Sequence, residues 1–513
     1  MNRRQLISSV TAATVLACVP VAPALAKPSA DPAPSVRGDT AGGTGGDVVN
    51  KVSIKTIKWH SCPPNEDDPK DVQCATFRVP WDWNKPNGKT YSLALKRLPA
   101  LKTKKPNRLK RTMFINPGGP GGSGTDLLSV FVDAIQLRKH FNIVGWDPRG
   151  VPTSKPLLNK CPNKPLVLPA TGSFTWKSVA EAFATEADTP VCIDRNRDQL
   201  RSLGTNNVIQ DLDAMRKAVG DSKLTYLGYS YGTTIGRLYA MRYPDKIRAL
   251  VMDGTVMPYN TMNKYAKSSI KASNAAWKYL LGLTGSDIQA LGNRVSDYLQ
   301  NNVVQFGSMQ LTRWGFWSSS LASAGRPNPV SVYTKLVCTV AEAADLPTDA
   351  CPPASRSANG DVDKLLREAE QEDEDAPIVS AVRCTDYIDR PSSGSVTDQF
   401  VAAGAVPQTS TNIFNRSLMC TGWPSPNPIP NLTGKVKTST PLLFVNGIAD
   451  QATGYWGAQQ TAKHFKGHRF ITVNTGMHGL SGTDANPCIQ QPVENYLIHR
   501  KLPAQNIYCQ QAK

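Results

Sequence analysis

A serine flanked by glycines lies where an apolar segment gives way to a helical one. GYSYG (228–232) is the only G-x-S-x-G in the 513-residue chain. The apolar segment LTYLGYS (224–230) precedes it, and residues 232–243 have helical character up to a proline. Glycines on both sides of a serine allow a turn sharp enough to hold the hydroxyl clear of a sheet, at a helix N-terminus. The pattern indicates that Ser230 is a nucleophile, rather than an exposed serine in an ordinary strand–helix turn.

A serine hydroxyl needs a base near neutral pH, usually a histidine that is oriented by a carboxylate. Of the six histidines, His478 lies in VNTGMHGL, a glycine-bracketed loop after the last apolar strand pattern. Asp450 ends the strand pattern LLFVNGIAD. The chain order of serine, acid and histidine matches the one found on α/β sheets that carry a G-x-S-x-G turn. Asp253, which ends the strand pattern IRALVMD, is the alternative acid.

A glycine-rich loop offers backbone N–H groups to some anion. TMFINPGGPGGSG (112–124) contains a G-x-G-x-x-G, and Asp147 follows at about the spacing of a dinucleotide-binding unit. Pro117 and Pro120, however, lack N–H groups that a pyrophosphate would use. Acyl transfer at a serine needs two backbone N–H groups aimed at an oxyanion, one of them from the residue after the nucleophile. We therefore interpret the loop as one half of an oxyanion hole, with the Tyr231 amide as the other half.

The first 26 residues have the composition of a secretory signal peptide. An arginine pair is followed by an apolar run over residues 6–21 and by the small-residue sequence ALA. We expect cleavage near Ala26, by either the general or the twin-arginine export route, and no lipid anchor at Cys18. Residues 27–50, rich in Ala, Pro, Gly and Ser, are predicted to be a disordered leader or pro-segment. No later apolar run reaches the roughly 20 residues that span a bilayer.

Ten cysteines remain outside the signal peptide, an even number that suits disulfides in an oxidising compartment. Proximity along the chain suggests, without fixing the connectivity, the pairs 62–74, 161–192, 338–351, 384–420 and 488–509. No Cys-x-x-Cys is present, so a zinc or redox site is not expected. The net charge of +18 includes a basic cluster between Lys96 and Arg111. Because no aromatic residues are interleaved there, we interpret the cluster as a solvated hairpin loop rather than a nucleic-acid site.

The strand and helix patterns predict an α/β protein. YSLALKRL (91–98) and RTMFINP (111–117) are predicted as neighbouring strands joined by the basic loop, and FNIVGW (141–146) as a third strand. A helix is predicted with Asn206 or Asn207 as its N-cap, and Gly220 is predicted to stop it.

The βαβ rhythm stops near residue 254 and resumes at 440, which predicts one mostly parallel sheet with a large insertion. We divide the chain into a first core part, a cap and a second core part, at residues 51–254, 255–430 and 431–513.

Several motifs together resemble one family. NPGGPGGSG, GWDPRG, GYSYG, VMDG, VNGIADQAT and GMHG, with RCTD and CTGWP in the insertion, are similar to the secreted tripeptidyl-aminopeptidase branch of the α/β-hydrolases. The resemblance runs from about Trp59 to Cys509. It implies an α/β-hydrolase fold with a mostly parallel central sheet and a large, mainly helical cap insertion. It also implies a secreted serine exopeptidase that releases short peptides, chiefly tripeptides, or amino acids from free N-termini, with no cofactor and no metal.

The resemblance also implies roles for single residues. The catalytic nucleophile, acid and base would be Ser230, Asp450 and His478. The oxyanion hole would be formed by the amides of Gly119 and Tyr231, with Gly118 as the alternative to Gly119.

Acidic cap residues anchor the substrate's α-ammonium group in the family. Asp386 is our candidate here, and a local cap or hydrogen bond is its alternative role. The acidic run 368–375 is interpreted as a solvated face, and Arg149 as a residue that ties loops together. Two departures from the family pattern put the substrate specificity in doubt: residues 451–454 read QATG where PVTP is common, and Pro152 stands where glycine is common.

These observations lead to one expected function and two alternatives. We expect a monomer that acts on peptides with a free N-terminus and binds neither nucleic acid nor membranes. The first alternative is a secreted esterase or other small-molecule hydrolase with the same triad, because one fold hosts many chemistries. The second is a non-catalytic binding protein, which an intact triad disfavours.

Overall fold

The computed structural model describes the chain in segments. They are residues 54–64, 68–69, 71–102, 111–158, 171, 189–306, 309–355, 376–402, 413, 417, 419–420, 423, 427–482 and 486–510. The predicted signal peptide and leader, the centre of the basic loop and the acidic run lie outside these residues.

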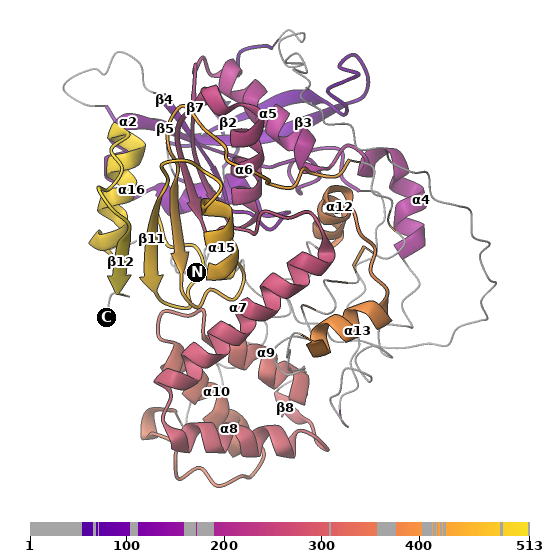
Figure 1. The fold of residues 1–513 in the computed structure, drawn as a ribbon, viewed down its shortest axis with the longest axis vertical. Coiled ribbons are helices and arrows are strands. Elements are labelled where there is room, and N and C mark those ends of the chain that lie inside the picture. The colour runs from indigo at the N-terminus through magenta and orange to yellow at the C-terminus, as the bar shows by residue number, and fades with distance from the viewer. Residues whose placement is uncertain are drawn as a thin grey trace.

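A single large sheet organises the described chain (Figure 1). Its strands follow the order β1-β2-β3-β5-β4-β6-β7-β10-β11-β12. Their bounds are β1 (His60–Ser61), β2 (Gln73–Pro80), β3 (Thr90–Leu98), β4 (Arg111–Asn116), β5 (Phe141–Trp146), β6 (Leu224–Tyr229), β7 (Ile247–Asp253), β10 (Leu443–Gly447), β11 (Arg469–Asn474) and β12 (Ile507–Gln510). The pairings from β5 to β12 are all parallel, and those of β1, β2 and β3 are antiparallel. The predicted mostly parallel sheet is confirmed.

The prediction that residues 91–98 and 111–117 form neighbouring strands is wrong. β5 lies between β3 and β4, antiparallel to the first and parallel to the second. The chain leaves β4 through short helices and returns as β5, a crossover that needs no pairing between β3 and β4. The basic segment between β3 and β4 is therefore not a hairpin loop.

Helices cover both faces of the sheet. The helices of the two core parts are α1 (Gly124–Leu127), η3 (Leu128–Phe131), α2 (Ile135–His140), α4 (Thr189–Leu200), α5 (Thr205–Ala218), α6 (Tyr231–Arg242), η4 (Pro244–Lys246), α15 (Tyr455–Ala462) and α16 (Pro487–His499). Apolar side chains of α5, α6 and α15 pack on one face, and those of η3, α2 and α16 on the other. The central strands β6, β7 and β10 are buried along their whole length, as expected for parallel strands covered on both faces.

The N-cap of helix α5 lies two or three residues earlier than predicted. The N-cap residue is Gly204, which has no side chain that could accept a hydrogen bond from the first turn. Instead the Thr205 N–H donates to the carboxylate of Asp386, far away in the sequence. Gly220, with φ of +83°, follows the helix end as predicted.

The described residues between β7 and β10 are mainly helical and include one small pair of antiparallel strands. They contain α7 (Met262–Leu283), α8 (Ser286–Tyr298), β8 (Val304–Phe306), β9 (Met309–Leu311), α9 (Arg313–Ser323), α10 (Pro329–Ala343), η5 (Pro353–Ser355), α12 (Ala376–Asp386) and α13 (Ser393–Ala402). Helices α7 to α10 share a hydrophobic cluster of their own, at the bottom of the view in Figure 1. Helix α12 instead packs into the cluster of the sheet and α5. The domain boundaries at 254 and 430 stay predictions.

Four of the five suggested disulfides are present. They join Cys62 to Cys74, Cys338 to Cys351, Cys384 to Cys420, and Cys488 to Cys509. The fifth, 161–192, cannot be compared, because Cys161 lies outside the described residues.

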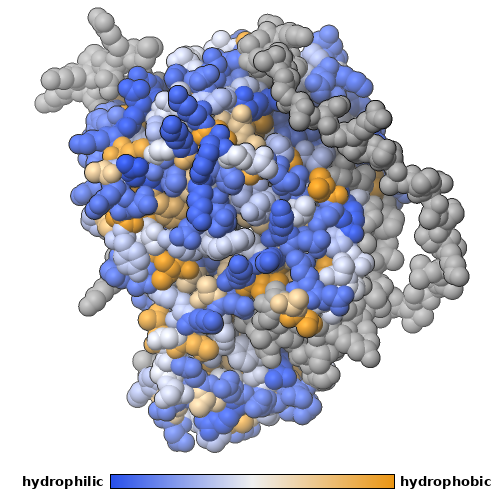
Figure 2. All heavy atoms as spheres, in the orientation of Figure 1, coloured by the Kyte–Doolittle hydropathy of each residue, from blue (hydrophilic) through white to orange (hydrophobic). Residues whose placement is uncertain are grey.

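The described surface is mostly hydrophilic on the face seen in Figure 2, where hydrophobic residues are scattered in small groups. None of the helices in the described segments is long and apolar enough to cross a membrane.

Candidate active site

Ser230 lies at a strained turn between β6 and α6. Its φ of 52° and ψ of −126° are unusual for a residue with a side chain. The turn is tight enough that a Cβ on Gly228 would lie 2.6 Å from the Gly232 carbonyl oxygen. Both flanking glycines are thus required by close backbone contact, and the predicted strand–turn–helix is observed. Strain of this kind at a strand end is typical of a functional residue.

Asp450 and His478 form a buried pair beyond the ends of β10 and β11. The Asp450 Oδ2 lies 2.7 Å from the His478 Nδ1. The backbone N–H groups of Ala452 and Thr453 donate to the Asp450 Oδ1, both at 2.9 Å, and the Thr453 hydroxyl donates to Oδ2 at 2.8 Å. The departure from the family pattern after the acid therefore leaves the carboxylate fully held.

The charge of Asp450 sets the ionisation of His478. Burial by itself lowers the pKa of His478, but the Asp450 charge and hydrogen bond outweigh it, so the pKa is raised above 6.5. Within the described part of the chain, the other ring nitrogen, Nε2, is buried and has no hydrogen-bond partner. A base held at Nδ1 with Nε2 available is the arrangement that general-base catalysis at a serine requires.

The end of β7 brings the serine and the histidine together. The Ser230 N–H donates to the Asp253 carbonyl at 3.0 Å. The His478 ring packs against the next residue, Gly254, where an added Cβ would lie 2.6 Å from Cε1. Asp253 therefore contacts Ser230, and its neighbour Gly254 contacts the His478 ring.

Asp253, the alternative acid, does not bond to the histidine. Its Oδ2 accepts from the N–H groups of Leu480 and Ser481, at 2.8 and 2.6 Å, and from the Ser481 hydroxyl. Burial raises the pKa of Asp253 to about 6. Its carboxylate therefore holds the loop that carries His478, whereas Asp450 contacts the ring itself.

The glycine loop lies against the serine turn. Gly118 and Gly119 have φ of +100° and +103°, and a Cβ on Gly118 would lie 2.7 Å from the Ser230 Cβ. The Gly118 N–H donates to the Asn116 side chain at 3.0 Å, which leaves Gly119 as the better oxyanion donor of the two. Tyr231 is the first residue of α6, so its N–H has no acceptor within the helix. Gly119 and Tyr231 thus line one cavity with Ser230, and their role as an oxyanion hole stays a prediction.

The dinucleotide interpretation of this loop is disfavoured by its surroundings. The loop leads into α1, a helix of only four residues. Asp147 accepts from the Ser123 hydroxyl and the Thr125 N–H, at 2.9 and 3.0 Å, so it holds the loop rather than facing a ligand. Arg149 is also buried and bonds to Asp211 and to three backbone carbonyls, in agreement with a role in tying loops together.

A cavity opens beside Ser230. Its lining combines the glycine loop, the serine turn, helices α7 and α12, and the loop after Asp450. The lining residues are Gly119, Pro120, Ser230, Tyr231, Thr234, Val256, Met257, Tyr265, Ser268, Ser269, Arg383, Asp386, Tyr387, Ala452, Thr453 and Gly454.

Asp386 lines this cavity and also has the local role that was its alternative. Besides the Thr205 N–H, at 2.8 Å, it accepts a hydrogen bond from the Thr205 hydroxyl. Burial raises the pKa of Asp386 to about 7.

Sequence reasoning missed several residues of the cavity wall. Tyr265, Ser268 and Ser269 have the i, i+3, i+4 spacing of one helical face. That spacing was a usable signal, but only the tertiary fold shows which way the face points. Arg383 opens the RCTD motif but was not singled out for a role, and Tyr387 directly follows that motif.

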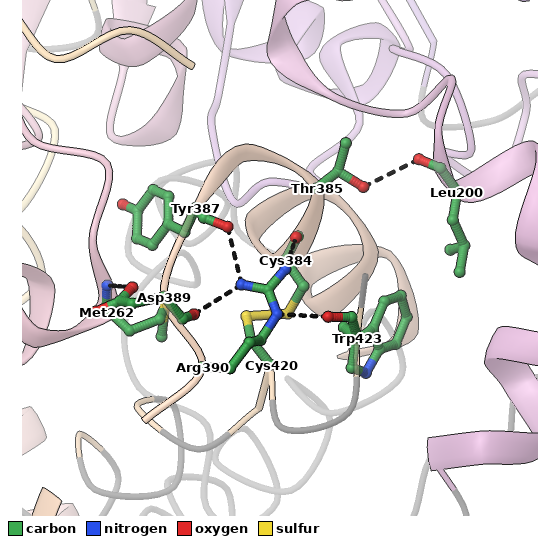
Figure 3. Close-up of a disulfide and its surroundings, with 9 residues drawn as sticks. All are labelled: Leu200, Met262, Cys384, Thr385, Tyr387, Asp389, Arg390, Cys420 and Trp423. Atoms are coloured by element: carbon green, nitrogen blue, oxygen red, sulfur yellow. Dashed lines mark hydrogen bonds between the residues drawn. A yellow bond between two sulfur atoms is a disulfide. The ribbon is translucent and has the colours of Figure 1, made fainter. Parts of the chain in front are cut away.

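A disulfide fixes the segment that carries these cap residues. Figure 3 shows the Cys384–Cys420 bond beside Arg390, whose guanidinium donates to the carbonyls of Cys384, Tyr387, Asp389 and Trp423. The Thr385 hydroxyl donates to the Leu200 carbonyl at 3.0 Å. The C-terminal end of α12 is thus held by the disulfide and Arg390 on one side and by the end of α4 on the other.

Comparison with known proteins identifies the family. The tripeptidyl aminopeptidase of Streptomyces lividans is 30% identical over 486 residues, which cover 88% of this chain and 86% of that protein. The chain belongs to the tripeptidyl aminopeptidase family. Residues 111–325 match the alpha/beta hydrolase fold family and residues 405–509 the TAP-like protein family.

Two further relatives differ in their named activities. The serine protease Hip1 of Mycobacterium tuberculosis is 38% identical over 212 residues, 39% of this chain and 40% of that protein. Carboxylesterase B of the same species is 28% identical over 505 residues, which cover 88% and 89% of the two chains. The predicted α/β-hydrolase fold and the predicted enzyme class, a serine hydrolase, are confirmed for this tripeptidyl aminopeptidase family member.

Proposed function

We propose that this enzyme is a secreted serine exopeptidase that releases short peptides, chiefly tripeptides, or amino acids from free N-termini. The observation that carries the proposal is the buried Asp450–His478 pair beside a strained serine that lines a cavity roofed by cap helices. Peptidase names among the relatives support the same substrate class.

In the proposed reaction, the Ser230 hydroxyl attacks a peptide carbonyl and its proton passes to the His478 Nε2. The amides of Gly119 and Tyr231 bind the oxyanion of the tetrahedral intermediate. His478 then gives the proton to the leaving amine as the C–N bond breaks. A water, deprotonated by His478, attacks the acyl-enzyme and releases the product. Asp450 keeps the imidazole oriented throughout.

Asp386 is our proposed contact for the substrate's α-ammonium group. It is the single carboxylate among the described residues that line the cavity. An ammonium group there would favour the ionised carboxylate, which burial disfavours in the free enzyme.

The test compares peptides that differ only in their N-terminus. Aminoacyl and tripeptidyl chromogenic substrates should be cleaved, and their N-acetylated forms should be poor substrates. Mass spectrometry of products from a mixed peptide library gives the step length. A serine-directed fluorophosphonate should label Ser230, and Ser230→Ala should abolish both labelling and turnover. Equal cleavage of free and acetylated peptides would contradict the aminopeptidase proposal.

An esterase is the second candidate, because a relative that spans nearly the whole chain is named carboxylesterase B. Acetyl and butyryl esters tested beside the peptides distinguish the two. Hydrolysis of esters alone would favour the esterase.

Secretion is the remaining part of the proposal. The four disulfides suit an oxidising compartment. Sequencing the mature N-terminus from an expressing culture tests cleavage near Ala26, and light scattering tests the predicted monomer.

A further inference from the structure

A single arginine lies in the cavity wall close to the proposed oxyanion hole. Arg383, on α12, is half-buried and lines the cavity with Ser230 and Gly119. Its guanidinium donates to the Tyr265 hydroxyl at 3.2 Å and to the Gly119 carbonyl at 3.4 Å, and it lies over the Tyr265 ring. The cation is therefore held beside the backbone that we propose to face the reacting carbonyl.

The charge of Arg383 is not neutralised by any described carboxylate. Its hydrogen bonds in the described structure go to a phenol and a backbone carbonyl, and no described ion pair includes it. A guanidinium has five N–H donors, so most of them stay available to a ligand.

Asp386, three residues further on α12, does not pair with Arg383. Its oxygens accept from the N–H and the hydroxyl of Thr205, and the cation that favours its ionised form is the buried Arg237. The cavity wall thus has two separate charged positions of opposite sign.

We propose that Arg383 binds a carboxylate of the substrate close to the scissile bond. Guanidinium groups pair with carboxylates through two parallel hydrogen bonds, which gives both strength and orientation. Tyr265 orients the guanidinium by its hydroxyl and ring, and the hydroxyls of Ser268 and Ser269 line the same cavity. The inference rests on the proposed function and adds to it a preference for acidic substrates.

The carboxylate could belong to an aspartyl or glutamyl side chain or to the free C-terminus of a short peptide. In either case the carboxylate must lie within a few bonds of the scissile carbonyl. Arg383 contacts Gly119, which lines the cavity beside Ser230. Matched substrates separate these sources. The pairs are Asp against Asn and Glu against Gln on each side of the scissile bond, and free peptide acids against C-terminal amides.

The experiment measures kcat/KM for each pair in the wild type, Arg383→Gln and Arg383→Lys. In the wild type, the acidic member of one pair should be preferred by about tenfold or more. Arg383→Gln should bring that ratio to about 1, and Arg383→Lys should keep part of it. Arg197→Gln is the matched control, because it removes the same charge from an exposed site with a side chain 58% exposed. It should leave the ratio as in the wild type.

Ionic strength gives a measurement that needs no variant. Higher salt should reduce the preference of the wild type for the acidic member, because the contact is between charges. A wild-type ratio near 1 in every pair would overturn the inference even if Arg383→Gln failed to fold. A ratio unchanged by Arg383→Gln in a folded protein that fluorophosphonate still labels would also overturn it.

A further pair of substrates distinguishes failure of the exopeptidase proposal from failure of the anion site at Arg383. The 4-nitrophenyl ester of glutaric acid and that of its monomethyl ester form a further acidic and neutral pair. If no peptide is cleaved but the acidic ester is preferred through Arg383, the exopeptidase proposal fails and the anion site stands. If peptides are cleaved without any acidic preference, the exopeptidase proposal stands and the anion site fails.

Discussion

Two buried aspartates lie near the proposed catalytic histidine, and their hydrogen bonds predict different consequences of substitution. Asp450 bonds to the His478 ring, whereas Asp253 bonds to the backbone of the following loop. Asp450→Asn should lower kcat by roughly 10⁴-fold, because the amide favours the wrong tautomer of the ring. Asp253→Asn keeps an oxygen for the loop donors and should lower kcat by less than about tenfold. Steady-state kinetics of both variants checks this, and loss of turnover only in Asp253→Asn would reverse the assignment.

The protonation of His478 determines the pH dependence that we expect for kcat/KM. General-base catalysis needs neutral His478, so kcat/KM should fall as the pH drops through the His478 pKa, which is raised above 6.5. Removing the Asp450 charge should lower that pKa and move the acid limb to lower pH. Asp253 also contributes to raising the pKa, as the weaker cause, so Asp253→Asn should move the limb less. The rate of fluorophosphonate labelling against pH measures the shift even in slow variants. An acid limb that stays in place in Asp450→Asn would contradict the pairing.

At the scale of elements, the glycine loop predicts a steric effect on activity. An alanine at 118 would place its Cβ 2.7 Å from the Ser230 Cβ and 2.8 Å from the Tyr231 nitrogen, at a φ of +100°. Gly118→Ala should therefore displace the oxyanion donors and lower kcat by at least about 10²-fold. Gly220→Ala is the control, because it has a similar φ of +83° and nothing within 4 Å. It should cost about 1 kcal/mol of stability and leave kcat unchanged. Similar kcat losses in both variants would indicate a general folding defect.

The Cys384–Cys420 disulfide predicts an effect on substrate binding. Replacing both cysteines by alanine releases the end of α12, which carries Arg383 and Asp386, so KM should rise several-fold as stability falls by about 3–4 kcal/mol. The Cys488–Cys509 pair closes a comparable loop between α16 and β12 and makes a matched control. Its double alanine variant should lose similar stability without a change in KM. Thermal unfolding and kinetics of the two variants together check this prediction.

Local sequence patterns predicted where strands and helices lie along the chain better than they predicted which of these elements pack side by side. Apolar runs located β6, β7, β10 and β11, because parallel strands buried on both faces need continuous hydrophobic sequence. The order of β3, β5 and β4 was missed, since pairing depends on a crossover that periodicity does not encode. The start of α5 was missed for a related reason: its capping carboxylate comes from Asp386, more than 180 residues away.

The whole molecule explains why the candidate triad residues could be ordered along the sequence whereas the cavity could not be predicted. Ser230, Asp450 and His478 each follow a strand and carry a local motif, so sequence alone could order them. The cavity combines the sheet's loops with α7 and α12, and only the assembled fold brings their side chains together. In our proposal, substrate specificity depends on contacts that only the assembled fold reveals, those of Arg383 above all.

That assembly predicts a limit on substrate size. Residues of α7 and α12 form part of the wall of the cavity beside Ser230. A chain end needs only one opening to enter such a cavity, whereas an internal segment also needs a second opening through which the chain continues. Short peptides should therefore be cleaved from their N-termini, and a folded, disulfide-bonded protein of similar sequence should resist cleavage at internal bonds. Mass spectrometry of timed digests distinguishes the cases: ladders that shorten from the N-terminus support the exopeptidase, and early internal fragments would contradict it.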